Sequence, residues 1–133
     1  MIRDAKQEDI DFVKALIESS DEMDADPETF SEEYFKRIIK KGILLVDEED
    51  DEIVGACFGT YKNEEQWADL LGIVVEEKFR NQRRGKALVT AFEEKLSPEI
   101  KTIDLYADET NTHLFDSLGY QRRRKYVAYR KHL

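Results

Sequence analysis

The sequence predicts a mixed α/β domain in which one sheet lies between helices. Short apolar runs rich in β-branched residues recur along the chain and indicate buried strands. Between them, apolar residues spaced three and four apart indicate amphipathic helices. No linker, internal repeat or low-complexity tract divides the 133 residues, so we expect one domain over residues 1–133. The expected order of elements is β-α-α-β-β-β-α-β-α-β.

Composition excludes several classes of protein. Apolar residues make up 41% of the chain, enough for a core, and charged residues make up 38%. The net charge of −9 argues against nucleic acid as the default partner. Cys57 is the one cysteine and cannot form an internal disulfide, so we expect a reducing, cytoplasmic location. No apolar run approaches the roughly 18 residues of a membrane span, and we expect no membrane partner.

The N-terminal third is expected to hold a strand, two helices and an acidic loop between the helices. The strand is expected at residues 2–5, and an apolar stripe at helical spacing covers residues 10–17. Residues 18–33 contain eight acidic residues and no Lys or Arg, with Pro27 inside the run. Pro27 makes residues 21–28 a loop. This acidic run fits either a solvated loop or an electrostatic lure for a cationic substrate.

A second helix and a β-hairpin are expected next. Residues 29–32 fit a T-x-x-E capping box at the start of the helix, and Gly42 is well placed to end it. Strands at 43–46 and 53–61, joined by an acidic turn at 47–52, form the hairpin. Cys57 lies among apolar neighbours in the second of these strands, which indicates a buried structural thiol.

The most informative stretch runs from an apolar strand through a basic turn into a helix. The strand is expected at residues 67–75, and Gly72 inside it indicates a bulge or a close backbone approach. The helix follows from Gly85 to about Leu96. The first amides of a helix lack internal partners and favour anions, so a phosphate-bearing ligand could bind here. The turn carries five basic residues: Lys78, Arg80, Arg83, Arg84 and Lys86.

The C-terminal part is expected to add a strand, a short helix and a closing strand region. Residues 102–107 alternate and predict a strand, and residues 108–118 predict a helix that Gly119 stops. Residues 120–133 predict one or two strands with a tight turn near Arg124.

Taken in this order, the motifs resemble those of the GCN5-related N-acetyltransferase (GNAT) superfamily. The start MIRDAKQEDIDFVKALI resembles the family's first strand and helix. The segment IVVEEKFRNQRRGKALV resembles its cofactor motif Q/R-x-x-G-x-G/A, and LYADETN followed by LFDSLGY resembles its closing strand and helix. The resemblance covers nearly the whole chain. It implies a GNAT-like, mostly antiparallel, twisted sheet with two parallel central strands that splay apart at the cofactor site.

The cofactor motif fits the family pattern in two registers. Aligned without a gap, Arg80 comes first, Arg83 stands where the first glycine is expected, and Gly85 is the second glycine. One register later, Gln82, Gly85 and Ala87 satisfy the pattern. A side chain at position 83 is compatible with the motif if its backbone stays near the right-handed helical region, where a Cβ does no harm.

The resemblance implies that acetyl-CoA is the co-substrate and lies between strands 70–75 and 103–107. Its pantetheine arm would pair with backbone groups near Ile73 to Val75, and its pyrophosphate would lie on the loop amides. Arg80, Arg84 and Lys86 are the side chains expected to neutralise phosphate charge. The expected cofactor-binding residues are Ile73, Val74, Val75, Arg80, Asn81, Gln82, Arg83, Arg84, Gly85, Lys86, Asn111 and Phe115.

The activity implied is transfer of an acetyl group to a primary amine, of a cationic small molecule or peptide. The Val75 amide could be the oxyanion donor. Asp69 is the first choice of general base and Glu76 the second, although both also fit surface carboxylates. The family's acid is a tyrosine, and Phe115 occupies its place here.

Several alternatives stay open at this stage. Tyr106 or Tyr120 could replace the missing acid, although both also fit simple packing. Phe115 equally suggests a non-catalytic acyl-CoA-binding or regulatory module. The basic run at 122–125 is the sole support for a nucleic-acid-associated protein, and no nucleic-acid partner is expected. No metal site is expected either, and the resemblance is compatible with a homodimer.

Overall fold

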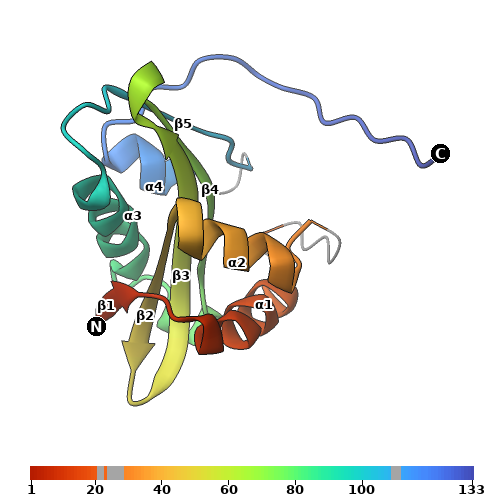
Figure 1. Cartoon of the computed structure of the whole chain (residues 1–133), viewed down its shortest axis with the longest axis vertical. Helices are drawn as coiled ribbons and strands as arrows, with labels where there is room; N and C mark the ends of the chain where they lie inside the picture. The colour runs from red at the N-terminus through yellow and green to blue at the C-terminus, as the bar shows by residue number, and fades with distance from the viewer. Residues whose placement is uncertain (21–22, 24–28, 109–111) are drawn as a thin grey trace.

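Five strands form a single sheet in the order β1-β2-β3-β4-β5 (Figure 1). The computed structural model describes residues 1–20, 23, 29–108 and 112–133. Neighbouring strands are antiparallel from β1 to β4, and β4 and β5 are parallel. The mixed, mostly antiparallel sheet expected from the sequence is therefore confirmed. The strands are β1 (Ile2–Asp4), β2 (Ile43–Glu49), β3 (Glu52–Lys62), β4 (Trp67–Val75) and β5 (Thr102–Leu105).

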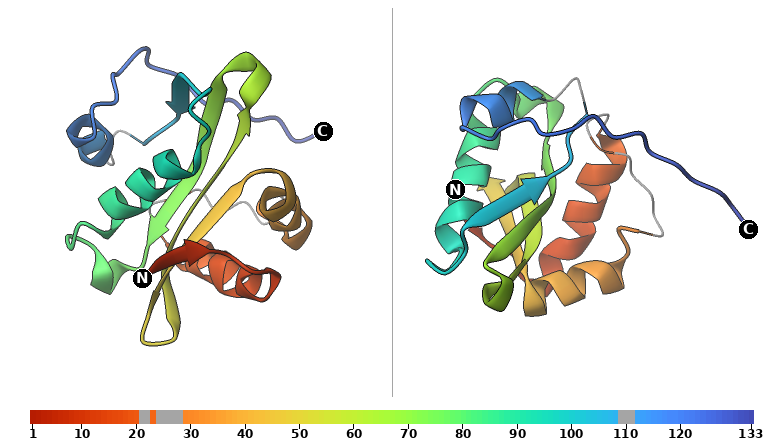
Figure 2. Two further views of the ribbon diagram at one scale, coloured as in Figure 1. Left: turned by 60° about the vertical axis from the view of Figure 1, so that its left-hand side comes forward. Right: turned by 90° about the horizontal axis from the view of Figure 1, so that it is seen from above.

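Helices cover both faces of this sheet. Figures 1 and 2 show α1 and α2 on one face and α3 on the other, with α4 beside α3. Two apolar cores result, one on each face. No helix among the described residues is long and apolar enough to cross a membrane. The helices are α1 (Ile10–Ser19), α2 (Glu32–Lys41), α3 (Arg84–Lys95) and α4 (Thr112–Ser117), with short 3-10 turns η1 (Gln7–Asp9), η2 (Asn63–Glu65) and η3 (Glu77–Phe79).

The core beneath α1 and α2 is built around aromatic rings. Phe35 of α2 meets Phe58 of β3 edge to face, with ring centroids 5.1 Å apart, and both side chains are fully buried. Burial of each of these rings contributes about 2 kcal/mol to stability, because its apolar surface is removed from water. On the opposite face, Leu88 and Phe92 of α3 pack over Cys57 of β3. Burial raises the pKa of the Cys57 thiol, which confirms an inert structural cysteine.

The start of α2 differs from the predicted capping box. Ser31, and not Thr29, is the N-cap: its Oγ accepts a hydrogen bond from the backbone N–H of Tyr34 at 3.1 Å. Both residues have the hydroxyl that a cap needs, and position 31 has the extended backbone that precedes a helix. The predicted end is confirmed, since Gly42 closes α2 by donating to the Ile38 carbonyl at 2.8 Å.

The β2–β3 hairpin is confirmed, but its turn is shorter than predicted. β2 continues to Glu49 and β3 begins at Glu52, so only Asp50 and Asp51 form the loop. Their φ angles of 50° and 66° are those of a two-residue turn that matches the twist of the strands. Acidic side chains on residues 47–49 concealed this extension of the strand from sequence reasoning.

The C-terminal third shows the largest departures. β5 ends at Leu105 instead of 107, and the helix predicted at 108–118 is the shorter α4. Gly119, with φ of 87°, ends α4 as expected. The strands predicted at 120–133 are absent, because residues 121–133 are exposed and pair with no strand. A strand pattern becomes a strand only where a partner edge supplies the hydrogen bonds.

Candidate functional site

β4 and β5 run side by side at one end and then part. Their pairing begins at Trp67–Thr102 and stops at Leu70–Leu105, where β5 ends. β4 continues for five more residues to Val75, paired on its other side with β3. In the described part of the chain, the β5 side of residues 71–75 therefore has no strand against it. This is the splayed geometry that the sequence led us to expect.

The backbone of this free segment presents polar groups to the gap. The Glu76 amide donates to the Val54 carbonyl at 2.8 Å, which makes Val54–Glu76 a hydrogen-bonded pair of the β3–β4 ladder. Such pairs alternate in antiparallel sheets, so Val74 also bonds β3, whereas Ile73 and Val75 direct their amides away from it. Of the three residues expected to pair with the pantetheine arm, two have the necessary orientation.

Gly72 fulfils both interpretations that its position suggested. The register of β3 against β4 shifts between Phe58–Gly72 and Gly59–Leu70, which leaves Leu71 as the extra residue of a bulge. A Cβ on Gly72 would lie 2.3 Å from the Phe58 ring. The bulge turns β4 just before its free segment begins.

Arg80 closes the end of β4. Its Nε donates to the Val75 carbonyl at 3.0 Å, and its guanidinium also reaches the hydroxyl of Ser20, just past α1, at 3.4 Å. The Val75 carbonyl is therefore occupied, while the Val75 amide still faces the gap. Arg80 places a positive charge beside these amides, at the mouth of the splayed strands.

The loop between β4 and α3 has an unusual backbone. Asn81 and Arg83 have φ angles of 63° and 62°, in the left-handed region. The right-handed backbone that would have made a side chain at position 83 harmless is not found: the loop has the conformation that glycine adopts freely, and Arg83 takes it at a cost. Alternation from left-handed Arg83 into right-handed Arg84 directs successive amides toward one point, as in anion-binding nests.

Helix α3 begins without a side-chain cap at Arg83. Its first internal hydrogen bond runs from the Ala87 amide to the Arg83 carbonyl at 3.1 Å. The amides of Arg84, Gly85 and Lys86 precede that bond and have no partner within the helix. An anion at this end would satisfy them and would also gain from the helix dipole.

Gly85 lies where β4, α3 and α4 meet. A Cβ built on it would lie 3.4 Å from Leu114 of α4 and 3.8 Å from Ile73 of β4. These are ordinary van der Waals distances, so a Cβ would fit at this position and packing alone does not require glycine. Among its neighbours in the loop, Asn81, Gln82 and Arg83 are exposed.

Arg84 is directed away from the gap by acidic partners. Its guanidinium contacts Asp47 and Glu49 of β2, at 3.0 Å each, and lies 5.0 Å from the centre of the Phe79 ring. The hydrogen bonds that the guanidinium donates to Glu49 and Asp47 raise the pKa of Arg84. Sequence reasoning missed this β2 carboxylate pair, because nothing in the local pattern at 47–49 indicates which loop packs above it.

The two candidate bases, Asp69 and Glu76, lie at different positions along the direction of β4. Asp69 is half-buried, four residues before Ile73 and in register with Thr60 on β3 and Asp104 on β5. Glu76 follows Val75 directly, and Lys78 lies 3.4 Å from its carboxylate. Asp69 and Val75 are six residues apart, roughly 20 Å along an extended strand, so they cannot act on one reacting atom. Ile73 is nearer, at roughly 13 Å.

The aromatic residues considered for proton donation are engaged in packing. Phe115 of α4 is buried against Tyr120, with ring centroids 5.8 Å apart. The Tyr120 hydroxyl donates to Glu93 of α3 at 3.1 Å, and burial together with this carboxylate raises the tyrosine's pKa. Tyr106 is exposed and meets Tyr126 edge to face.

Some expected site residues lie outside the described part of the chain. Asn111 is one of them, and all the acidic residues at 21–28, considered as an electrostatic lure, also lie there. Within the described ranges, no group of His, Cys, Asp and Glu could hold a metal ion.

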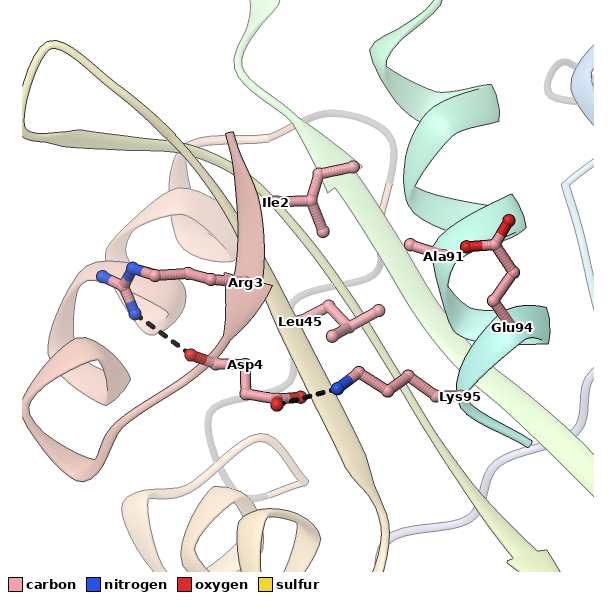
Figure 3. A pocket seen from close by; sticks show the side chains of 7 residues that line it. All are labelled: Ile2, Arg3, Asp4, Leu45, Ala91, Glu94 and Lys95. Atoms are coloured by element: carbon pink, nitrogen blue, oxygen red, sulfur yellow. Dashed lines mark hydrogen bonds and ion pairs between the residues drawn. The ribbon is translucent and has the colours of Figure 1, made fainter. Parts of the chain in front are cut away.

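A hollow of the surface lies away from the gap. Figure 3 shows it between β1 and α3, where Lys95 reaches across to Asp4 at 2.8 Å. It measures about 680 Å³, and Ile2, Leu45 and Ala91 form its apolar part. None of the residues that line it is an expected site residue.

Comparison with known proteins agrees with this fold. The model of the acetyltransferase (GNAT) family matches residues 11–120, and the chain belongs to this family. Among curated proteins, no sequence matches the chain.

Three solved structures illustrate the shared fold. A transcriptional regulator from Bacillus halodurans C-125 superposes with a TM-score of 0.78 at 21% identity, over 98% of this chain and 99% of that one. PaiA N-acetyltransferase from Thermoplasma acidophilum, in complex with coenzyme A, gives 0.73 at 18% identity, over 90% and 86%. Diaminobutyrate acetyltransferase from Paenibacillus lautus, in complex with L-2,4-diaminobutyric acid and coenzyme A, gives 0.72 at 19% identity, over 89% and 73%.

Proposed function

We propose that this chain is an acetyl-CoA-dependent N-acetyltransferase that acts on a primary amine of a cationic small molecule or peptide. One observation carries the proposal: the amides of Ile73 and Val75, unpaired on the β5 side, lie on the strand that leads directly into the uncapped N-terminus of α3. An extended ligand with amide groups at one end and phosphates at the other fits both features at once. Two relatives of this fold are structures with coenzyme A bound.

The chain's own groups divide the binding work. The Ile73 carbonyl and the Val75 amide would pair with the pantetheine arm, which supports them in place of a sheet neighbour. The first amides of α3 would hold the pyrophosphate. Arg83 and Lys86 are the loop cations best placed to add charge, because Arg84 is held by Asp47 and Glu49. Acetyl-CoA supplies the activated thioester when it is bound.

The transfer needs a neutral amine, a polarised carbonyl and a proton for the thiolate that leaves. The amine nitrogen forms a bond to the acetyl carbon, the carbon–sulfur bond breaks, and the proton lost by the amine returns to the sulfur or to water. We assign the oxyanion contact to the Ile73 amide and the base to Asp69 acting through water, because Val75 is too far from Asp69. In the alternative assignment, the Val75 amide is the oxyanion donor and Glu76 is the base.

The acceptor is proposed to be cationic because two acidic side chains meet where β4 and β5 are paired, just before the strands part. Asp69 and Asp104 are in register on adjacent strands, so their side chains project from the same face. Like charges in this arrangement repel, and an ammonium group between them would relieve the repulsion. The diaminobutyrate relative is a structure with a diamine acid bound.

A direct assay of thiol release tests the activity. The purified chain is incubated with acetyl-CoA and with diamines, polyamines, aminoglycosides and basic peptides in turn. We expect release with at least one cationic amine, and a loss of turnover of at least 100-fold in Asp69→Asn. Asp104→Asn is the matched control, because it removes the neighbouring charge and is expected mainly to raise KM. Absence of release with every amine would refute the proposal.

A second candidate function is a non-catalytic acyl-CoA-binding module. It is favoured by buried Phe115 at the position of the family's acid and by the engagement of the Tyr120 hydroxyl with Glu93. This candidate predicts that CoA raises the melting temperature while no amine is acetylated. Ligand at about 100 times its Kd would add about 2.7 kcal/mol to the free energy of unfolding.

A further inference from the structure

The guanidinium of Arg84 uses each of its nitrogens on a different partner. Nη1 donates to Asp47 and Nη2 donates to Glu49, at 3.0 Å each, and Nε donates to Gln82 at 3.3 Å. The central carbon of the group lies 5.0 Å from the centre of the Phe79 ring, which adds a cation–π contact. The side chain is 19% exposed, so these contacts are partly shielded from water. We call Arg84 with its two carboxylates, Asp47 and Glu49, the clamp.

The clamp joins the loop between β4 and α3 to the sheet. Phe79 ends η3 at the start of this loop and Gln82 lies within it, so the loop wraps around one guanidinium. Both carboxylates belong to β2, a strand with a neighbour on each side. The planar fork of an arginine suits such a junction, because it can hold several acceptors in fixed directions at once. The loop and the first residue of α3 are therefore tied to a firmly paired strand.

The backbone of this loop needs support from outside. Asn81 and Arg83 have positive φ angles, and such a backbone persists only where the surrounding contacts determine it. Both side chains are exposed, so they contribute little packing of their own. The buried residues of α3 begin at Leu88, one turn after Arg84. The clamp therefore holds the start of α3 at the point that the apolar core does not reach.

Charge alone would give the two carboxylates the opposite effect. Asp47 and Glu49 are negative, and they lie near a helix N-terminus that favours anions. Negative charge at this place repels a phosphate. Arg84 compensates part of that charge, and the Met1 amino group, 3.1 Å from Asp47, compensates more. What the carboxylates offer an anion site is therefore geometry and not charge.

We propose that Asp47 and Glu49 are positioning residues for the acetyl-CoA site of the proposed function, on which this role rests. By holding the Arg84 side chain they keep the first amides of α3 directed toward one point, where the pyrophosphate lies. Neither carboxylate contacts the ligand, and the effect passes from the side chain of Arg84 to its backbone. A binding group is precise only when the residues behind it hold it in place. The clamp therefore sets how tightly the phosphates are held.

Two variants of the clamp and one matched control test this role. Asp47→Ala with Glu49→Ala removes both carboxylates that hold Arg84. Glu49→Ala alone is the milder change, because Glu49 is 40% exposed whereas Asp47 is buried. The control is Asp50→Asn with Asp51→Asn, which removes the same amount of negative charge from the same hairpin. Asparagine tolerates the left-handed backbone of that turn, and the contacts of the clamp stay in place.

Calorimetric titration of each full-length protein measures the Kd for CoA and for inorganic pyrophosphate, and far-UV circular dichroism checks that the protein is folded. We expect the double alanine variant to bind both ligands about 10-fold more weakly than wild type. Glu49→Ala should weaken binding by a smaller factor. The control should bind as wild type does or slightly more tightly, because it loses only repulsion. In the acetyl transfer assay, the KM for acetyl-CoA should rise in the double variant while kcat and the KM for the amine stay within about twofold, whereas a general loosening of the fold would change all three.

Clamp variants that bind CoA as tightly as wild type, or more tightly, would overturn the positioning role, because the carboxylates would then act through charge alone. Equal weakening in the control would overturn it too, since any acid of the hairpin would then have the same effect. If the double variant does not fold, Glu49→Ala decides between these outcomes. A wild type that binds CoA but acetylates no amine refutes the proposed function and leaves the comparison of Kd values as the test of the clamp. A wild type that binds neither CoA nor pyrophosphate refutes both.

Discussion

The left-handed backbone of Arg83 leads to a prediction that separates conformation from charge. Any residue with a Cβ is destabilised in that region by about 1–2 kcal/mol relative to glycine. Glycine also has more conformational freedom in the unfolded chain, which offsets part of its advantage in the folded state. The net advantage of glycine in free energy of unfolding is therefore about 1 kcal/mol. Arg83→Gly is therefore expected to be more stable than Arg83→Ala by about 1 kcal/mol, equivalent to roughly 4 °C in Tm.

A matched pair of control variants is made at Thr90, in the helix that begins directly after Arg83. Thr90 is exposed in the interior of α3, where the backbone is right-handed. There Thr90→Ala is expected to be more stable than Thr90→Gly by about 1 kcal/mol. This order of alanine and glycine is the reverse of the one expected at position 83. Urea unfolding of the four variants measures both differences. An alanine at position 83 that is as stable as the glycine would refute the left-handed assignment and the loop geometry that depends on it.

Three further predictions concern single side chains. The hydrogen bonds from Arg3 lower the pKa of Asp9, so Asp9 stabilises the fold above its unfolded pKa of about 4 and loses this contribution as pH falls through its folded pKa. In urea unfolding, Asp9→Asn should therefore lower the free energy of unfolding by about 2 kcal/mol at pH 7 and by progressively less below pH 4. Burial raises the pKa of Cys57, so an aromatic disulfide reagent should label it only at the rate at which the domain unfolds, and rapid labelling would contradict the buried site. Tyr120→Phe should cost about 1 kcal/mol through the lost bond to Glu93 and leave kcat within twofold; a 100-fold fall would instead identify Tyr120 as the acid.

Sequence reasoning predicted the elements whose signals are local. The apolar run predicted both bounds of β4, Trp67 and Val75, and a glycine inside that run, Gly72, predicted the bulge. Gly42 and Gly119 gave the ends of α2 and α4, because glycine commonly follows the last turn of a helix.

Features that depend on distant partners were not predictable. The Arg84 guanidinium is fixed by β2 carboxylates 35 and 37 positions away, which no spacing rule connects to the loop. Residues 121–133 include residue types that favour strands, but whether they form a strand depends on a partner edge being within reach. The handedness of Arg83 follows from the path between β4 and α3, so its side chain gave no indication of it.

The four-residue ladder between β4 and β5 has a consequence for how the domain moves. Everything from β5 onward is joined to the rest of the sheet by that short ladder and by the packing of α4 on α3. Amide hydrogens of β5 are therefore expected to exchange with solvent before those of β2 and β3. A ligand that bridges Ile73, Val75 and the start of α3 would slow exchange on both sides of the gap. Occupancy of the gap is therefore expected to be measurable from backbone protection alone, before any product is formed.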